Sequence, residues 1–472
     1  MHRIVIIFFV ILLPEFLIGQ VEYPNDKIKL LAVVDPNKDS IYTAGGFKYS
    51  GCWGWYQKER RKEYALIGGT NGTYFIDITN PKAPIICDYV QGKNHCLWRE
   101  IKTYNNYCYV VTECQEGLKI IDMKYLPDSV HVVSTGTNVL TNSHTIWIDG
   151  NKLYCGSLKI GPGNYAGMSV FSLMNPELPV FLRSVNSDYS FVGAHDMFSR
   201  RDTIYASSGG QLYILKYDSV VNKFIMLGSY VNYSKQGYNH SNFLTENGKY
   251  LVFCDEIPAA VPIHLVDVTN LENIQPASEF LPYPLTTPHN PYILGNDWAI
   301  ISCYEDGLHI YDISDPNNVK HAGFFDTYPQ SGFLQGFYTG GYTGNWGAYP
   351  FLPSKTIIAT DMINGAFFLD ASEAFAKSQT AVLTAQPAEI INDCAVIYTI
   401  PASKFIQVKA KAQNNGKIIL STPEGKTLYV SNYSEDLNER INTENMANGF
   451  YILSVGGSDC KVTKKILITH ID

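Results

Sequence analysis

Short stretches in which apolar and polar residues alternate cover most of the chain between residues 30 and 370. In the clearest stretch, an alternating strand at 145–148 meets the turn sequence Asp-Gly-Asn and then a second strand at 152–155. Two more strands follow at 169–173 and 180–185, separated by the turn sequence Asn-Pro. This order predicts a unit of four short antiparallel strands.

The unit is repeated along the chain. An apolar strand that ends in an aspartate-containing turn reads YFIDITNP at 74–81, IHLVDVTN at 263–270 and IYDISDP at 310–316. Looser copies surround Asp122, Ser172, Leu215 and Asp370. The step between copies is about 45 to 58 residues, which is the length of one four-stranded propeller blade. The repeats therefore predict an all-β fold, a seven-bladed β-propeller over residues 29–370.

The two ends of this region complement each other. The last repeat stops near Asp370 without a fourth strand, whereas the strand at 29–35 precedes the first repeat without partners. We expect this N-terminal strand to complete the last blade, so that no long sheet edge stays exposed. Residues 371–394 then form a linker, and six or seven short strands at 395–472 predict a small immunoglobulin-like β-sandwich.

Residues 1–19 have the features of a secretory signal peptide: a basic start, an apolar run and a small residue at the end. Pro14 and Glu15 interrupt the run before it is long enough to span a membrane. No later segment is predicted to be a transmembrane span. The 44 acidic and 36 basic residues are not grouped in blocks, which argues against a nucleic-acid partner.

The chain has ten cysteines, and export would permit disulfides. Four of them, Cys108, Cys155, Cys254 and Cys303, lie inside strand-like runs, where a free thiol packs as a small apolar group. We expect these to be free. Cys394 and Cys460 flank the C-terminal module and form the disulfide to test first.

Histidines stand at the start of the first strand in five successive repeats. The first strand of a blade is the innermost, so these side chains should surround one central funnel. Cys52 and Asn345 occupy the matching positions of the first and last repeats. The predicted funnel residues are therefore His95, His144, His195, His240, His289, Cys52 and Asn345.

Acidic residues follow the second strands and should emerge on the same face of the propeller. They are Glu113, Asp255, Glu256, Glu305 and Asp361, and Asp196 follows a histidine directly. Imidazoles and carboxylates that converge could hold a divalent metal, with Zn, Cu, Fe or Mn as candidates. The residues proposed for such a site are His195, His240, His289, Glu113, Asp255 and Glu256. Propeller histidines also serve as backbone hydrogen-bonding groups, so a structural role stays open.

Several phrases resemble the choice-of-anchor B family of exported proteins, which carry LVIVD-type repeats. They include WGWYQKERRKEYALIGGTNGTYFIDITNP at 53–81, SHTIWID at 143–149, AHD at 194–196, YNHSNFLTENGKYLVFCDE at 238–256 and WGAYPFLPS at 346–354. The resemblance covers nearly all of residues 30–370. It implies a propeller that is exported, and it implies no particular activity.

The C-terminal module resembles a type A sorting domain of the type IX secretion system. The similar segments are IYTIPASKFIQV at 397–408, GKIILSTPEGKTLY at 416–429, MANGFYILSV at 446–455 and TKKILI at 463–468. The resemblance implies the type IX machinery as a partner. It also implies a secreted protein or one attached to the outer cell surface.

Motifs of common hydrolases, P-loop proteins and zinc proteins are absent from the sequence. We therefore expect a binding or interaction module with its extracellular ligand on the funnel face, rather than an enzyme. A metal-dependent enzyme with a histidine and carboxylate centre in the funnel is one alternative. A structural or adhesive surface protein is another.

Overall fold

The structure is a computed structural model that describes residues 23–36, 46–136, 139–161, 163–282, 286–329, 343–376, 390–392, 395–398, 405–423, 425–458 and 460–468. The predicted signal peptide at 1–19 and most of the predicted linker lie outside these residues. Within them the secondary structure is almost entirely antiparallel strands, with one short 3₁₀ helix, η1 (Val185–Ser187). The all-β prediction is confirmed.

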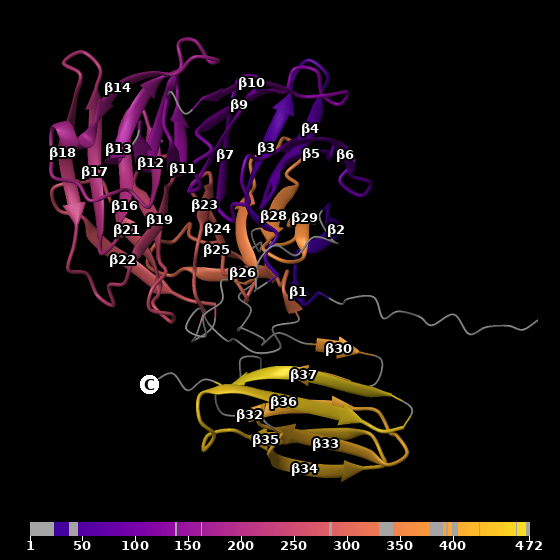
Figure 1. Ribbon diagram of the computed structural model, residues 1–472. Coiled ribbons are helices and arrows are strands. Elements are labelled where there is room, and N and C mark those ends of the chain that lie inside the picture. The colour runs from indigo at the N-terminus through magenta and orange to yellow at the C-terminus, as the bar shows by residue number, and fades with distance from the viewer. Residues whose placement is uncertain are drawn as a thin grey trace, which may run out of the picture.

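Seven sheets follow one another between residues 25 and 370, and Figure 1 shows them as one body. Sheet 1 contains β3 (Tyr49–Gln57), β4 (Lys62–Gly69), β5 (Gly72–Asp77) and β6 (Ile85–Gln91). Sheet 2 contains β7 (Arg99–Tyr104), β8 (Tyr107–Thr112), β9 (Leu118–Asp122) and β10 (His131–Gly136). Sheet 3 contains β11 (Asn142–Asp149), β12 (Lys152–Ile160), β13 (Asn164–Ser172) and β14 (Val180–Ser184).

Sheet 4 contains β15 (Asp196–Arg200), β16 (Thr203–Ser208), β17 (Gln211–Asp218) and β18 (Lys223–Tyr230). Sheet 5 contains β19 (Asn239–Leu244), β20 (Tyr250–Asp255), β21 (Ile263–Asp267) and β22 (Gln275–Phe280). Sheet 6 contains β23 (Pro291–Leu294), β24 (Trp298–Ser302), β25 (Leu308–Asp312), β26 (Lys320–Phe325) and β1 (Asn25–Asp26). Sheet 7 contains β27 (Asn345–Tyr349), β28 (Ile357–Asp361), β29 (Gly365–Asp370) and β2 (Lys29–Val34).

The N-terminal segment supplies the outer strands of two sheets that come last along the chain. β2 pairs antiparallel with β29, and β1 pairs with β26. The edges of β29 and β26 are thus covered by strands from about 300 residues or more away, because Lys29 pairs with Asp370 and Asn25 with Phe325. Such pairing protects edges that would otherwise be open to other chains.

Tight turns join the strands where the sequence predicts them. Asp149 and Lys152 pair at the ends of β11 and β12, and Gly150 between them has φ +57°. A two-residue hairpin turn requires a residue in the left-handed backbone conformation, and glycine adopts this conformation without a steric penalty.

Each sheet buries both of its faces. In β4, Ala65 and Ile67 pack with residues of sheet 7, whereas Tyr64 and Leu66 pack with residues of sheet 2. Alternate side chains point to opposite faces of a strand, so one apolar strand serves two interfaces. The same two-sheet cores lie between sheets 2 and 3, 3 and 4, and 6 and 7, and one larger core joins sheets 4, 5 and 6.

The first strands of consecutive sheets are neighbours. β3 contacts β7 and β27, β11 contacts β7 and β15, β19 contacts β15 and β23, and β27 contacts β24. Large rings from these strands pack together at one end, with the centroids of Trp53 and Tyr349 4.7 Å apart and those of Phe198 and Phe243 4.5 Å apart. This aromatic floor is formed by Trp53, Trp147, Phe198, Phe243, Tyr292, Tyr349 and Phe351.

The C-terminal strands form two further sheets, drawn in yellow and orange in Figure 1. One contains β30 (Ile390–Asn392), β31 (Ala395–Tyr398), β32 (Phe405–Ala410) and β35 (Leu437–Asn442). The other contains β33 (Gly416–Ser421), β34 (Thr427–Tyr433), β36 (Gly449–Gly456) and β37 (Lys461–Ile468). Ile406, Ile441, Ile418 and Leu453 share one core between the two sheets, as in a sandwich. β30 lies within the predicted linker, so the sandwich begins earlier than residue 395.

Close packing of the first strands gives a testable prediction at Gly54 in β3. A Cβ at this position would overlap the ring of Tyr349, whereas a Cβ at Gly347 in the neighbouring β27 would meet nothing closer than 3.8 Å. We expect Gly54→Ala to lower the free energy of unfolding by about 1–3 kcal/mol, the usual effect of overpacking. Gly347→Ala is the matched control and should unfold like wild type in urea, followed by tryptophan fluorescence. Equal stability of the two variants would contradict the packing described.

Candidate functional site

A cavity lies where the first strands begin, at the end opposite the aromatic floor. It is small, with about 30 Å³ of space for the centres of water molecules. Its lining comes from sheets 2 to 7, because each of these sheets contributes the residues at the start of its first strand. The lining residues are Trp98, Arg99, Glu100, His144, Thr145, His195, Asp196, His240, His289, Asn290 and Trp346.

Six aromatic rings form a continuous row around this cavity. The ring centroids of successive members are 4.0 Å apart for His144 and His195 and 4.2 Å apart for His195 and His240. The row continues at 4.2 Å to His289, at 4.3 Å to Trp346 and at 4.4 Å to Trp98. Equivalent positions on neighbouring first strands bring these rings together, and we call this set the ring row.

His289 is held in one tautomer. Its Nδ1 lies 2.6 Å from the backbone carbonyl oxygen of Trp346, so Nδ1 carries the proton and donates it. The other nitrogen, Nε2, is therefore unprotonated, and it is buried without a hydrogen-bond partner. Burial lowers the pKa of His289 to about 3, so the ring is neutral at physiological pH.

His240 and His195 are neutral as well. Burial lowers the pKa of both rings well below the ordinary histidine value, and the other histidines of the row lower it further. The Nδ1 atom of each ring is buried and makes no hydrogen bond. Protein interiors pair nearly all such atoms, so three unpaired imidazole nitrogens beside one cavity are unusual.

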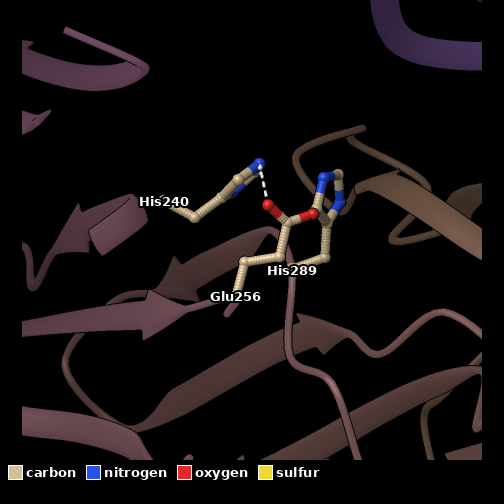
Figure 2. Close-up of side chains that lie close together, drawn as sticks. All are labelled: His240, Glu256 and His289. Carbon is tan, nitrogen blue, oxygen red and sulfur yellow. Dashed lines mark ion pairs between the residues drawn. The ribbon is translucent and has the colours of Figure 1, made fainter. Parts of the chain in front are cut away.

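Glu256 enters this group from the segment that follows β20. Its Oε1 accepts a hydrogen bond of 2.6 Å from the Tyr304 hydroxyl, and its Oε2 lies 3.9 Å from Nε2 of His240. Figure 2 shows the carboxylate between the His240 and His289 rings. Burial raises the pKa of Glu256 to about 7. One donor atom from each of His240, Glu256 and His289 lies within 4.8 Å of the others, which makes this trio the candidate metal-binding group among the described residues.

Two more carboxylates line the cavity. Asp196 accepts a hydrogen bond of 2.8 Å from the Thr145 hydroxyl, and Glu100 pairs with the Lys102 ammonium group. Burial raises the pKa of both acids, although Lys102 opposes this effect. The Lys102 ammonium group in turn lies 4.2 Å from the ring centroid of Trp53 in the aromatic floor.

His144 differs from the other three histidines of the ring row. Burial alone would lower its pKa, but the hydrogen bond and charge of Glu113, with the charges of Asp196 and Glu100, outweigh burial and raise it. Its Nδ1 lies 2.6 Å from Oε1 of Glu113, whose side chain is partly exposed. This pair forms one rim of the cavity.

Three predicted funnel residues do not line the cavity. His95 is exposed and pairs with Asn71. Cys52 is buried in the core between sheets 7 and 1, where burial raises the pKa of its thiol to about 12. Asn345 is buried and donates from Nδ2 to the backbone carbonyl of Thr360 over 3.0 Å. The prediction placed five histidines together, and the structure brings together four.

Three of the acidic residues predicted to lie on the funnel face instead accept hydrogen bonds from neighbouring segments of the chain. Asp255 accepts hydrogen bonds from the Tyr233 hydroxyl at 3.0 Å and from the Gly237 amide at 2.6 Å. Glu305 accepts one from the Thr343 hydroxyl at 2.6 Å, and Asp361 accepts one from the Thr327 hydroxyl at 2.7 Å. None of these three side chains lines the cavity.

The sequence reasoning missed Trp98, Trp346 and Glu100. Trp98 directly precedes β7, as His195 directly precedes β15, and this strand-start position was the available signal. An alignment of the repeats on their histidines selected His95 instead, which lies three residues before Trp98. At sheet 7, Trp346 lines the cavity, whereas its neighbour Asn345 donates from Nδ2 to the backbone carbonyl of Thr360; the strand has a register shift between Asn345 and Gly347.

The cysteine predictions can be compared with the structure in part. Cys108, Cys155, Cys254 and Cys303 are free and buried, as expected. A disulfide between Cys96 and Cys114 was missed. Cys460 is disulfide-bonded, whereas Cys394 lies outside the described residues.

Comparison with known families identifies the C-terminal module. Residues 396–469 match the model of the secretion system C-terminal sorting domain, which confirms the predicted sorting domain and indicates export. No curated protein matches the chain. In the part of the chain that the structure describes, no helix is long and apolar enough to cross a membrane.

Burial of Asp361 gives a pH-dependent prediction. Burial raises the pKa of Asp361 from 3.8 to about 7. Its favourable contribution to the free energy of unfolding is therefore complete below pH 3.8 and is lost as the pH rises through 7. Asp361→Asn does not titrate; its Oδ1 can still accept from the Ile363 and Asn364 amides, and its Nδ2 can donate to the Thr327 hydroxyl, which accepts. Relative to wild type, its free energy of unfolding should rise between pH 4 and pH 8 by on the order of 4 kcal/mol, at about 1.4 kcal/mol per pKa unit.

Urea unfolding at several pH values measures this difference. Glu177→Gln, at an exposed position, is the control and should show no comparable trend. A difference between Asp361→Asn and wild type that stays constant with pH would contradict the buried, protonated aspartate.

Proposed function

We propose that the seven sheets are the blades of a closed seven-bladed β-propeller, with a funnel at its axis. The contact of β27 with both β3 and β24 supports closure between the first and last sheets. The cores shared by sheets 6 and 7 and by sheets 7 and 1 support it as well. In this arrangement β2 is the outer strand of the last blade.

We further propose that the protein is an exported binding module whose funnel cavity takes a small cation. The observation that carries this proposal is the pair of partly buried carboxylates Glu100 and Asp196 in the cavity lining, with the buried Glu256 carboxylate close to the lining residues His240 and His289. Lys102 neutralises one of them, and three of the four histidines are neutral. A cation would compensate the remaining negative charge, and the tryptophan faces at the mouth would favour it too.

A metal-dependent enzyme is the second candidate. It is favoured by the His240, Glu256 and His289 group, because two imidazoles and a carboxylate also form catalytic metal centres. Catalysis would require a substrate position beside the metal, and the cavity lined by His240 and His289 is the place for it.

The type IX secretion machinery is the proposed partner of the C-terminal domain, and the secreted or surface-attached form is the proposed product of export. The sorting-domain match at 396–469 supports this route. The predicted signal peptide would bring the chain to the periplasm first.

Cation binding can be tested by calorimetric titration of the purified protein with methylammonium, guanidinium, choline and divalent metal ions, with acetate as an anionic control. Wild type should bind at least one cation and should not bind acetate. The double variant Glu100→Gln, Asp196→Asn should bind at least tenfold more weakly, because hydrogen bonds to charged groups and ionic attraction are both reduced. Asp196→Asn still accepts from Thr145.

Glu177→Gln, on the outer surface, is the matched control and should bind like wild type. Binding of acetate in preference to the cations, or the same cation affinity in the double variant, would refute a cationic ligand. Absence of binding for every cation would refute it as well.

Export can be tested in a host with type IX machinery by deleting residues 395–472. The truncated protein should accumulate in the periplasm, because the sorting domain is removed while the signal peptide is kept. Cell fractionation and immunoblotting measure its location, and the full-length Asp196→Asn variant should still be exported. Normal appearance of the truncated protein at the cell surface or in the medium would show that the tail is not the sorting signal.

A further inference from the structure

The donor atoms of His240, Glu256 and His289 are spaced almost as a metal ion requires. They lie within 4.8 Å of one another, and Nε2 of His240 and Oε2 of Glu256 are separated by 3.9 Å. Tetrahedral zinc with bonds of about 2.0–2.1 Å places its ligand atoms about 3.3 Å apart. Side-chain rotations that move these atoms by about 1 Å would therefore close the site around an ion.

Two of the three donors, His289 and Glu256, already have a partner that sets their orientation. Nδ1 of His289 donates to the carbonyl oxygen of Trp346 at 2.6 Å, which leaves the lone pair of Nε2 available to a ligand. Oε1 of Glu256 accepts from the Tyr304 hydroxyl at 2.6 Å, which leaves Oε2 on the side of His240. Metal-binding histidines and carboxylates are usually oriented by such second partners. A purely structural histidine needs only the Nδ1 bond, and the buried Nε2 of His289 has no use in that role.

Burial makes the arrangement unfavourable without an ion. Nε2 of His289 is buried without a hydrogen-bond partner, and Glu256 has its carboxylate between the two rings. The three residues are between 0 and 4% exposed, so few of their polar atoms can form hydrogen bonds with water. A bound cation would satisfy an imidazole lone pair and the carboxylate together.

The chemistry of the donors selects the class of ion. Two imidazole nitrogens and one carboxylate oxygen suit zinc and neighbouring first-row transition metals. Calcium and magnesium prefer sets made of oxygen ligands, and copper(I) prefers sulfur. His195, the next ring of the row, and the carboxylate of Asp196 lie on the same cavity wall. His240 and His289 themselves line the cavity, so an ion held between them would lie beside it.

We propose that His240, Glu256 and His289 bind one transition-metal ion of the zinc type, with the fourth position open to the cavity. This inference rests on the proposed function, in which the cavity is a cation site, and it identifies the cation and its ligands. Glu100 and Asp196 would then face a water molecule or ligand at the open position rather than the ion itself.

The test uses full-length protein that has been treated with a chelator and then titrated with Zn²⁺. Calorimetry and elemental analysis should give one zinc per chain, and Co²⁺ should produce the visible absorption of a low-symmetry nitrogen and oxygen site. Glu256→Gln, His240→Gln and His289→Gln should each lose at least a hundredfold in zinc affinity. Tyr304→Phe, which removes the hydrogen bond to Oε1, should lose about tenfold to a hundredfold, as is usual for second partners of metal ligands.

Two controls separate loss of metal from loss of fold. His95→Gln changes an exposed histidine outside the cavity and should keep the affinity of wild type. Glu256→Gln keeps an acceptor for Tyr304 and removes a buried charge, so its metal-free form should melt no lower than metal-free wild type. It should nevertheless show no rise in melting temperature with zinc, whereas wild type should show one.

Absence of stoichiometric zinc or cobalt binding would overturn the metal site, as would wild-type affinity in both Glu256→Gln and His289→Gln. The organic cations distinguish this failure from failure of the proposed function. If methylammonium, guanidinium or choline binds in a manner that depends on Glu100 and Asp196 while zinc does not bind, the cavity is a cation site without a metal. If neither kind of cation binds, both proposals fail.

Discussion

The structure depends on the burial of both faces of each sheet between its neighbours. A single four-stranded sheet such as β3 to β6 has apolar residues on both sides, with Ile67 toward one neighbour and Leu66 toward the other. Such a sheet is not stable alone, since half of its apolar surface would stay in water. The sheets must therefore stack, and stacking brings their first strands side by side. The cavity is a geometric result of this packing.

Because the first strands lie side by side, residues at the equivalent position of successive repeats come together and form one site. Neighbouring first strands place equivalent side chains about 4 Å apart, as the distances from His144 to His195 and from His195 to His240 show. Burial lowers the pKa of the inner imidazoles, and at this spacing the repulsion between protonated rings lowers it further. The inner rings are neutral for this reason, and a neutral imidazole has a free lone pair. Only His144, beside Glu113 at the rim, has a raised pKa.

Much of the strand pattern could be predicted from the sequence, because alternation and turn residues are local signals. The Asp-Gly-Asn turn at 149–151 and the orphan strand near residue 29 correspond to the β11–β12 hairpin and to β2. The cavity lining depends on which residue of a first strand faces the axis, and that is a matter of register. Asn345 and Trp346 differ by one position, yet only Trp346 faces the cavity. The role of Tyr304 required knowledge of contacts across sheets, since it lies 48 residues from Glu256.

The free thiols have a consequence for the order of events during export. Among the described residues six cysteines are free, and Cys87 is partly exposed. The other five, Cys52, Cys108, Cys155, Cys254 and Cys303, are buried in the cores between sheets, and burial raises the pKa of each of these thiols. A buried, protonated thiol reacts slowly with oxidants, whereas the same thiol in an unfolded chain is accessible. An oxidising compartment that forms the Cys96–Cys114 disulfide would therefore also cross-link chains whose sheets have not yet stacked. Stacking of the sheets is thus the step that protects this chain from incorrect oxidation.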